Sequence, residues 1–439
     1  MLRLGLVALA VLHASPARAE PISLREAVDF ALQHHPLLER LAYDHASAAA
    51  RIGRARAGLL PRLSLSGSIR EDYVDPIDVS AGMPGFGKEN LYNVGLTVTQ
   101  LVTDSGLTPS IVEGARASER QATAQIAVSQ LDIELAVVQA YLNVLQSKEL
   151  LGVSTEAIVL VNEQLARATA TFKTTLRPEI DVLSAKTQLS QAQLQRLSDE
   201  NSIETNLVVL ENAIGDDGAR RLEVAPLDIK PVAEEARPVD ELGAAAIAHR
   251  PELAALRDAI AAAEASVHVG ERRTRPVVSL QGGVYANGGA SDHTPLAESW
   301  IPGGGVFAQL GLNWDLYTGN ADTYEIADAL GQVHAARAEL KRNQQAIVAS
   351  VRQAALAVRI SRESLAVSIE WRTQSERQLQ FAQARYQNGV GTFVELNDAR
   401  TNLVNARRQE VQAHYSLAQN RISLARELGR PASTLAAPR

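Results

Sequence analysis

The sequence predicts a mainly α-helical chain that carries four β-strands and consists of two tandem copies of one structural unit. Two long stretches lack proline, one between Pro109 and Pro178 and one between Pro302 and Pro431. Short alternating apolar and polar segments precede both stretches, and two pairs of similar segments recur at nearly one separation. A helix of about 60 residues is about 90 Å long, which exceeds the width of a globular domain.

Internal similarity defines the two copies. Glu26–Leu38 aligns with Glu241–Leu253 at an offset of 215 residues, and Phe172–Lys186 aligns with Tyr386–Arg400 at an offset of 214. A single deletion between the two matches accounts for the difference. We therefore expect a first structural repeat over residues 20–230 and a second over 231–439, each with helix, two strands and a long helical hairpin.

The first 19 residues have the features of a secretory signal peptide. A charged start at Arg3, an apolar run and the small-residue site Ala17-Arg18-Ala19 follow one another in the expected order. We expect a signal peptide over 1–19, because the alternative, an N-terminal buried helix, has no need of such an end. No later window holds 18 apolar residues, so any membrane crossing downstream would need a β-barrel.

Helices begin and end each copy. Ala-rich stretches at 24–58 and 239–273 should be bent or restarted by Pro36 and Pro251. The long helical hairpins should have their tips at residues 172–180 and 386–394.

Two strands lie between the helices of each copy. Their expected positions are near 61–74, 91–103, 276–287 and 305–317, with Gly/Pro-rich loops at 75–90 and 288–304. Val306–Leu316 is apolar on one face and polar on the other, which fits a barrel wall or a half-buried soluble sheet. About eight strands are the usual minimum for a barrel, so closure would need several chains.

Composition excludes other classes of protein. The chain has no cysteine, which excludes disulfide scaffolds and cysteine-ligated metal sites. Its 43 basic and 50 acidic residues argue against a nucleic-acid-binding surface. We find no catalytic or dinucleotide-binding motif, and His34-His35 lacks a nearby third ligand. The sequence therefore predicts no enzyme activity, no cofactor and no metal site.

Several segments resemble the TolC-like outer membrane factor family. They are Ala31-Leu32 before Pro36, and the tip Tyr386–Gly391 followed by Val394–Arg400. The resemblance covers essentially the whole mature chain. It implies a homotrimer whose strands form one twelve-stranded transmembrane β-barrel in outer membrane lipid and whose helices form a periplasmic tunnel. It also implies docking to a periplasmic adaptor (membrane fusion) protein and to an inner-membrane pump or ABC transporter.

The resemblance also implies a channel constriction. Glu395 and Asp398 match two acids that line the periplasmic constriction in the family, and their spacing places both on one helical face. Asp181 and Tyr386 match further constriction residues, whereas Gly391 stands where a basic partner is expected. Three copies would gather six carboxylates that attract cations. Without the resemblance, two solvated acids on an exposed helix remain the ordinary interpretation.

Adaptor docking is expected at the hairpin tips. The candidate residues are Thr175, Leu176 and Arg177 in the first copy and Gly389, Val390 and Gly391 in the second. Plain turn chemistry explains the same residues without a partner.

The predicted function is an outer membrane channel that carries substrates passively from an inner-membrane transporter to the exterior. Small-molecule efflux and type I secretion of polypeptide both remain open. The alternative from another class is a periplasmic helical-hairpin scaffold protein without channel activity.

Overall fold

The computed structural model describes residues 21–74, 87–173, 179–216, 222–231, 235, 237–291 and 301–438. The expected signal peptide lies outside these residues. The chain forms two compact units. The helical unit comprises Met1–Leu41, Ile126–Pro251 and Asn343–Arg439, and the sheet unit comprises Ala42–Gln125 and Glu252–Arg342.

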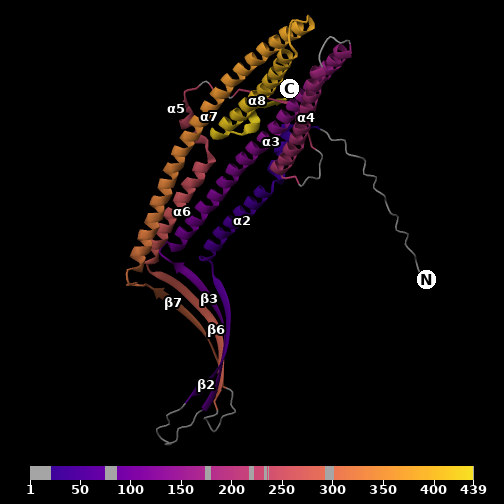
Figure 1. Ribbon diagram of the computed structural model, residues 1–439. Helices are drawn as coiled ribbons and strands as arrows, with labels where there is room; N and C mark the ends of the chain where they lie inside the picture. The colour runs from indigo at the N-terminus through magenta and orange to yellow at the C-terminus, as the bar shows by residue number, and fades with distance from the viewer. Residues whose placement is uncertain are drawn as a thin grey trace, which may run out of the picture. The chain divides into compact units, whose positions relative to one another are not determined.

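Eight α-helices account for most of the described residues (Figure 1). The shorter helices are α1 (Leu24–His34), α2 (Pro36–Ala57), α5 (Val239–His249) and α6 (Pro251–Arg273). The longer helices are α3 (Leu107–Lys173), α4 (Glu179–Ile214), α7 (Ala321–Gln387) and α8 (Phe393–Glu427). Helices α3 and α7 have 67 residues each, as the long proline-free stretches predict.

Proline sets the breaks between the short helices, as expected. His35 has extended backbone angles, φ −66° and ψ 124°, and Pro36 begins α2. Arg250 has φ −75° and ψ 122°, and Pro251 begins α6. The pyrrolidine ring disfavours the helical conformation of the preceding residue, so each helix ends at that point.

The sheet unit contains one antiparallel sheet with the strand order β2-β3-β6-β7 (Figure 1). The strands are β2 (Arg62–Val74), β3 (Gly87–Thr103), β6 (Val277–Ser291) and β7 (Ile301–Asn313).

The strands extend further into the expected loops than the composition predicts. Residues 288–291 and 301–304 are strand and not loop, because Gly288 pairs with Pro302 and the ladder reaches Ile301. Strand β7 ends at Asn313, short of the expected 317. The next residue, Trp314, donates a 3.0 Å hydrogen bond from Nε1 to the Thr274 carbonyl.

One face of this sheet is an exposed apolar surface. The pairing aligns Leu65, Leu96, Val284 and Val306 in one row across all four strands. Their exposed fractions are 75%, 40%, 49% and 80%. Covering such a surface by lipid or by protein is strongly favourable, at about 25 cal/mol per Å².

The core of the helical unit surrounds Tyr141 of α3, which is 1% exposed. Its hydroxyl contacts the carbonyl oxygens of Ile22 at 3.0 Å and Ala225 at 2.7 Å. Burial raises the pKa of Tyr141 to about 12. Ile22 belongs to β1 (Pro21–Ile22), and Ala225 directly follows β4 (Glu223–Val224), the strand that pairs with β1 in parallel. One side chain therefore attaches both short strands to α3. A second pair, β5 (Leu227–Ile229) with β8 (Ala436–Pro438), brings the end of the chain beside them, after the short helix η1 (Ala432–Leu435).

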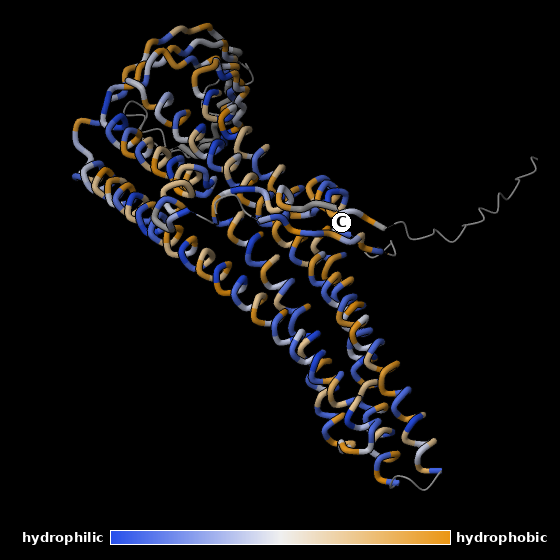
Figure 2. Tube along the Cα trace, turned by 90° about the horizontal axis from the view of Figure 1, so that it is seen from above, coloured by the Kyte–Doolittle hydropathy of each residue, from blue (hydrophilic) through white to orange (hydrophobic). Residues whose placement is uncertain are grey.

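Hydrophobic and hydrophilic residues alternate along the long helices (Figure 2). None of the helices in the described part of the chain has an apolar stretch that could span a membrane.

Replacing Tyr141 with Phe should lower the free energy of unfolding by about 1–2 kcal/mol, because the hydroxyl's hydrogen bond to the Ala225 carbonyl is lost. Tyr324→Phe is the matched control, since Tyr324 is 73% exposed and should change stability by less than about 0.5 kcal/mol. Urea unfolding followed by circular dichroism measures both variants. Equal losses would contradict the role given to the Tyr141 hydroxyl.

Candidate functional site: the hairpin tip and the helix faces beside it

The turn between α7 and α8 is a Schellman motif. Gly389 has a left-handed φ of +76°. The Val390 amide donates to the Arg385 carbonyl at 3.1 Å, and the Gly389 amide donates to the Tyr386 carbonyl at 3.2 Å. These two bonds are those that end a helix in this motif. The turn leaves Val390 69% exposed at the tip.

Gly391 explains why the expected basic residue is absent. A Cβ atom at this position would lie 2.9 Å from Arg385 Cβ and 2.9 Å from the Tyr386 backbone nitrogen. The Gly391 amide also donates to the Arg385 carbonyl at 3.0 Å, which holds its backbone close to α7. This turn therefore has no space for a side chain at 391.

Arg385 supplies a basic group at the same tip, which sequence reasoning missed. Its Nε lies 3.5 Å from Glu395 Oε2, and the two side chains are 58% and 49% exposed. An exposed pair of this kind contributes at most about 1 kcal/mol and weakens with salt. The signal in the sequence was an arginine one helical turn before the glycines.

The first turns of α8 have two distinct faces. Phe393, Leu396 and Ala399 are buried, and the last two pack with Leu379 and Ala382 of α7. Tyr386 packs against this cluster and meets the Phe393 ring edge-on at 6.3 Å. The packing fixes the rotation of α8 about its axis.

Glu395 and Asp398 lie on the opposite, exposed face of α8. The Thr392 hydroxyl caps the helix by accepting a 3.1 Å hydrogen bond from the Glu395 amide. Both carboxylates therefore point away from the buried face of α8, in the first two turns of the helix. Their part in a constriction stays a prediction.

Asp181 differs from this pair. It lies in the first turn of α4 and is only 8% exposed, so its own chain covers most of it. The neighbouring tip residues Thr175, Leu176 and Arg177 lie outside the described residues.

A buried arginine near the tip was also missed. Arg400 of α8 is 5% exposed and donates a hydrogen bond from Nη1 to the side-chain oxygen of Gln164 on α3. Burial, together with the charge of Arg167, lowers the pKa of Arg400 to about 10. No local sequence signal indicates this contact, because 236 residues separate the two side chains.

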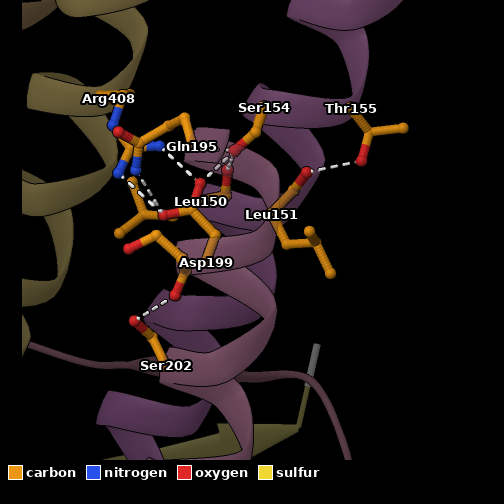
Figure 3. A network of polar contacts seen from close by, with 9 residues as sticks. Leu150, Leu151, Ser154, Thr155, Gln195, Asp199, Ser202 and Arg408 are labelled. Atoms are coloured by element: carbon orange, nitrogen blue, oxygen red, sulfur yellow. Dashed lines mark hydrogen bonds and ion pairs between the residues drawn. The ribbon is translucent and has the colours of Figure 1, made fainter. Parts of the chain in front are cut away.

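Further along the hairpins, a buried network joins three helices (Figure 3). Asp199 of α4 accepts hydrogen bonds from Arg408 of α8 at 2.7 and 3.0 Å, from Gln195 at 3.1 Å, and from Ser154 of α3. Burial of the Asp199 carboxyl favours its neutral form, but the hydrogen bonds from Arg408 and Ser154 outweigh that effect. The pKa of Asp199 consequently lies below its usual value.

The two adjacent histidines, His34 and His35, have different surroundings. His34 is exposed and stacks on Phe30, whereas His35 is half-buried and accepts a 3.1 Å hydrogen bond from the Leu37 amide. Burial lowers the pKa of His35. Among the described residues, no group of three or more potential His, Cys, Asp or Glu ligands is close enough to hold a metal ion.

The fold and the paired hairpins define a class of protein. The family model described as outer membrane efflux protein matches this chain twice, over residues 27–216 and 242–430. The chain belongs to the outer membrane efflux protein family, whose members are non-enzymatic conduits.

Individual relatives agree with this assignment. Protein CyaE of Bordetella pertussis is 26% identical over 418 residues, which cover 94% of this chain and 86% of the relative. The outer membrane protein TolC of Vibrio cholerae is 23% identical over 409 residues, or 93% of this chain and 90% of that protein. A crystal structure of CusC superposes with a TM-score of 0.79 at 16% identity, covering 93% of this chain and 92% of the other.

Gly389→Ala should loosen the tip, because a left-handed conformation costs a residue with a Cβ about 1–2 kcal/mol. Hydrogen exchange at the Val390 and Gly391 amides should accelerate roughly tenfold. Gly331→Ala is the control, since a Cβ added at this helical glycine would also meet nothing within 4 Å, but its φ is not positive. That change should leave the tip unaltered and stabilise α7 by up to about 1 kcal/mol. Unchanged exchange in Gly389→Ala would contradict the motif.

Asp199→Asn should lower the free energy of unfolding by about 3 kcal/mol at pH 7, because Arg408 loses its buried counter-charge. The pKa of Asp199 is lowered in the folded chain, so its contribution is fully present above the unfolded value of about 3.9. It is lost as the pH falls through the folded value. The difference between variant and wild type should therefore shrink below about pH 4.

Glu339→Gln is the control for this experiment. Glu339 pairs with Arg342 on an exposed surface, with side chains 43% and 69% exposed, and should contribute less than about 1 kcal/mol at any pH. Denaturant titrations between pH 3 and pH 8 compare the two. A difference for Asp199→Asn that does not change with pH would refute the charged pair.

Proposed function

We propose that this chain is the exit duct of a tripartite efflux system or a type I secretion system in the outer membrane. Membership of the outer membrane efflux protein family supports this proposal. The exposed apolar face of the sheet adds a physical reason, because lipid would cover it favourably.

The proposed assembly is a homotrimer. Within the described residues, β2 and β7 each pair on one side only, so both edges of the sheet can accept a strand. Three copies joined edge to edge would supply twelve strands, enough to close a barrel, whereas one copy supplies four. The helices would then extend into the periplasm after removal of the signal peptide.

The observation that carries the gating proposal is the exposure of Glu395 and Asp398 on one face of α8. Both stand within two turns of the tip, on the side opposite the packed residues. A threefold arrangement would bring six such carboxylates around one axis, with Asp181 and Tyr386 behind them. The resulting negative potential would favour cations at the constriction.

Docking of a periplasmic adaptor at the tips is the remaining part of the proposal. Two features of the second tip support it. Val390 presents an apolar side chain to solvent, and the open space around Gly389 leaves its backbone accessible to a partner. Thr175, Leu176 and Arg177 would make the corresponding surface on the first hairpin. An inner-membrane pump or ABC transporter would complete the system.

A periplasmic scaffold without channel activity is the second candidate, favoured by the length of the hairpins alone. Fractionation distinguishes it, because a scaffold would be recovered in the periplasmic extract and a channel in the detergent-extracted outer membrane. Planar-bilayer recording of the purified mature chain then tests conductance directly. Absence of discrete conductance steps from a well-folded soluble monomer would favour the scaffold.

Replacing Glu395 with Gln and Asp398 with Asn together should lower the cation-to-anion permeability ratio several-fold, because the constriction loses its negative charge. Reversal potentials under a salt gradient measure the ratio. The matched control replaces Glu363 and Glu370 with Gln, which removes the same charge from exposed positions of α7. Equal permeability ratios in the wild type and the Glu395/Asp398 variant would refute the constriction.

A further inference from the structure

Arg400 stands apart from the other arginines of α8. The helix contains five arginines, and four of them contact a carboxylate outside α8. Those pairs are Arg407 with Glu156, Arg408 with Asp199, Arg421 with Glu235, and Arg426 with Asp132. Arg400 instead donates to the neutral side chain of Gln164.

Two buried donors beside this contact lack an acceptor. Arg400 and Gln164 are 5% and 3% exposed. The Nε atom of Arg400 and the Nε2 atom of Gln164 make no hydrogen bond with any residue that the structure describes. Leaving a buried donor unpaired is unfavourable, and more so for a charged group, so an acceptor at this place would be strongly favoured.

Both side chains line one cavity of about 770 Å³ within the helical unit. Other described residues around it include Arg167, Thr171 and Tyr386. The charged residues among its described lining are Arg167 and Arg400. Glu163 pairs with Arg167 at 3.1 Å, with both side chains about half exposed, so among the described residues Arg400 forms no ion pair of its own.

We propose that this cavity is a binding site for a carboxylate group, held by the guanidinium group of Arg400 and the side-chain amide of Gln164 once both turn toward the cavity, and attracted by Arg167. A carboxylate has two oxygens and can accept from both donors at once. It would give Arg400 the type of partner that the other four arginines of α8 have. The carboxylate is supplied by a small free acid or by an acidic side chain of a protein that docks at the hairpin ends. The site stands on this geometry alone and does not depend on the channel proposal.

The first experiment measures thermal unfolding of the purified mature chain in detergent against sodium succinate at constant ionic strength. The unfolding temperature should rise with succinate and saturate, because a ligand that binds the folded chain stabilises it. Neutral succinamide should have no effect. Arg400→Gln should raise the Kd for succinate tenfold or more, since a charge-assisted hydrogen bond is lost.

Arg359→Gln is the matched control, because Arg359 is exposed on α7 and is absent from the described lining of the cavity. Its Kd should stay within about twofold of the wild type, as expected for a surface charge. An equal loss of affinity in Arg359→Gln and Arg400→Gln would overturn the proposal, since it would mean binding by net charge alone.

Two peptides distinguish the sources of the carboxylate. They are N-acetyl-Gly-Glu-Gly-amide and its Gln counterpart, used in the same assay. A response to the Glu peptide but not to succinate supports a docked protein side chain, a response to succinate alone supports a free acid, and a response to both supports the site for either. No response to either, or an equal response to the Gln peptide, overturns the proposal.

Gln164→Glu keeps the test decisive if Arg400→Gln fails to fold. This change places a carboxylate beside Arg400 within the chain itself. The variant should unfold at a higher temperature than the wild type without ligand and should lose its response to succinate. A lower unfolding temperature with an unchanged succinate response would overturn the proposal.

Discussion

The helical unit depends on the ion pairs that the arginines of α8 form with neighbouring parts of the chain. Ion pairs join α8 to α3 through Arg407 and Arg426, and to α4 through Arg408. Arg421 of α8 and Arg362 of α7 both pair with Glu235. Ion pairs with buried members act differently from apolar contacts, because a shift of one turn would leave a charge unpaired at a cost of about 3–5 kcal/mol. The pairs therefore set the register of α8, whereas the apolar core supplies most of the favourable burial.

That register determines what α8 presents at the tip. While Arg408 is held by Asp199, the first two turns of α8 pack Leu396 and Ala399 against α7. Glu395 and Asp398 then have only the exposed side of the helix available. The Schellman turn closes the same end from the α7 side, and Gly391 lets the two helices approach closely. The direction of the two acids thus follows from the adjacent packing against α7, and their position along the helix from the ion pairs several turns away.

Local sequence signals predicted much of this fold. Both hairpin tips fall where proline and glycine interrupt helical sequence, at Lys173 to Glu179 and at Gln387 to Phe393. The ends of the expected loop at 288–304 were predicted wrongly, because glycine and proline composition says nothing of the ladder that pairs Gly288 with Pro302. Arg400 could not have been found in this way, since its partner Gln164 is remote in sequence. Periodicity can show that Arg400, Arg407 and Arg421 recur at multiples of seven residues, but not what they meet.

The two kinds of charge contact at this end of the helical unit differ in strength for a physical reason. The Arg385–Glu395 pair is about half exposed on both sides, so water and salt compete with it and breaking it costs little. The Arg408–Asp199 pair is mostly buried, with side chains 20% and 5% exposed, and its rupture would leave a largely buried charge without its counter-charge. The outermost turn can therefore rearrange at a small cost in free energy, while the helices below it remain in register. A partner that displaces Arg385 from Glu395 therefore breaks a weak contact and leaves the buried pairs intact.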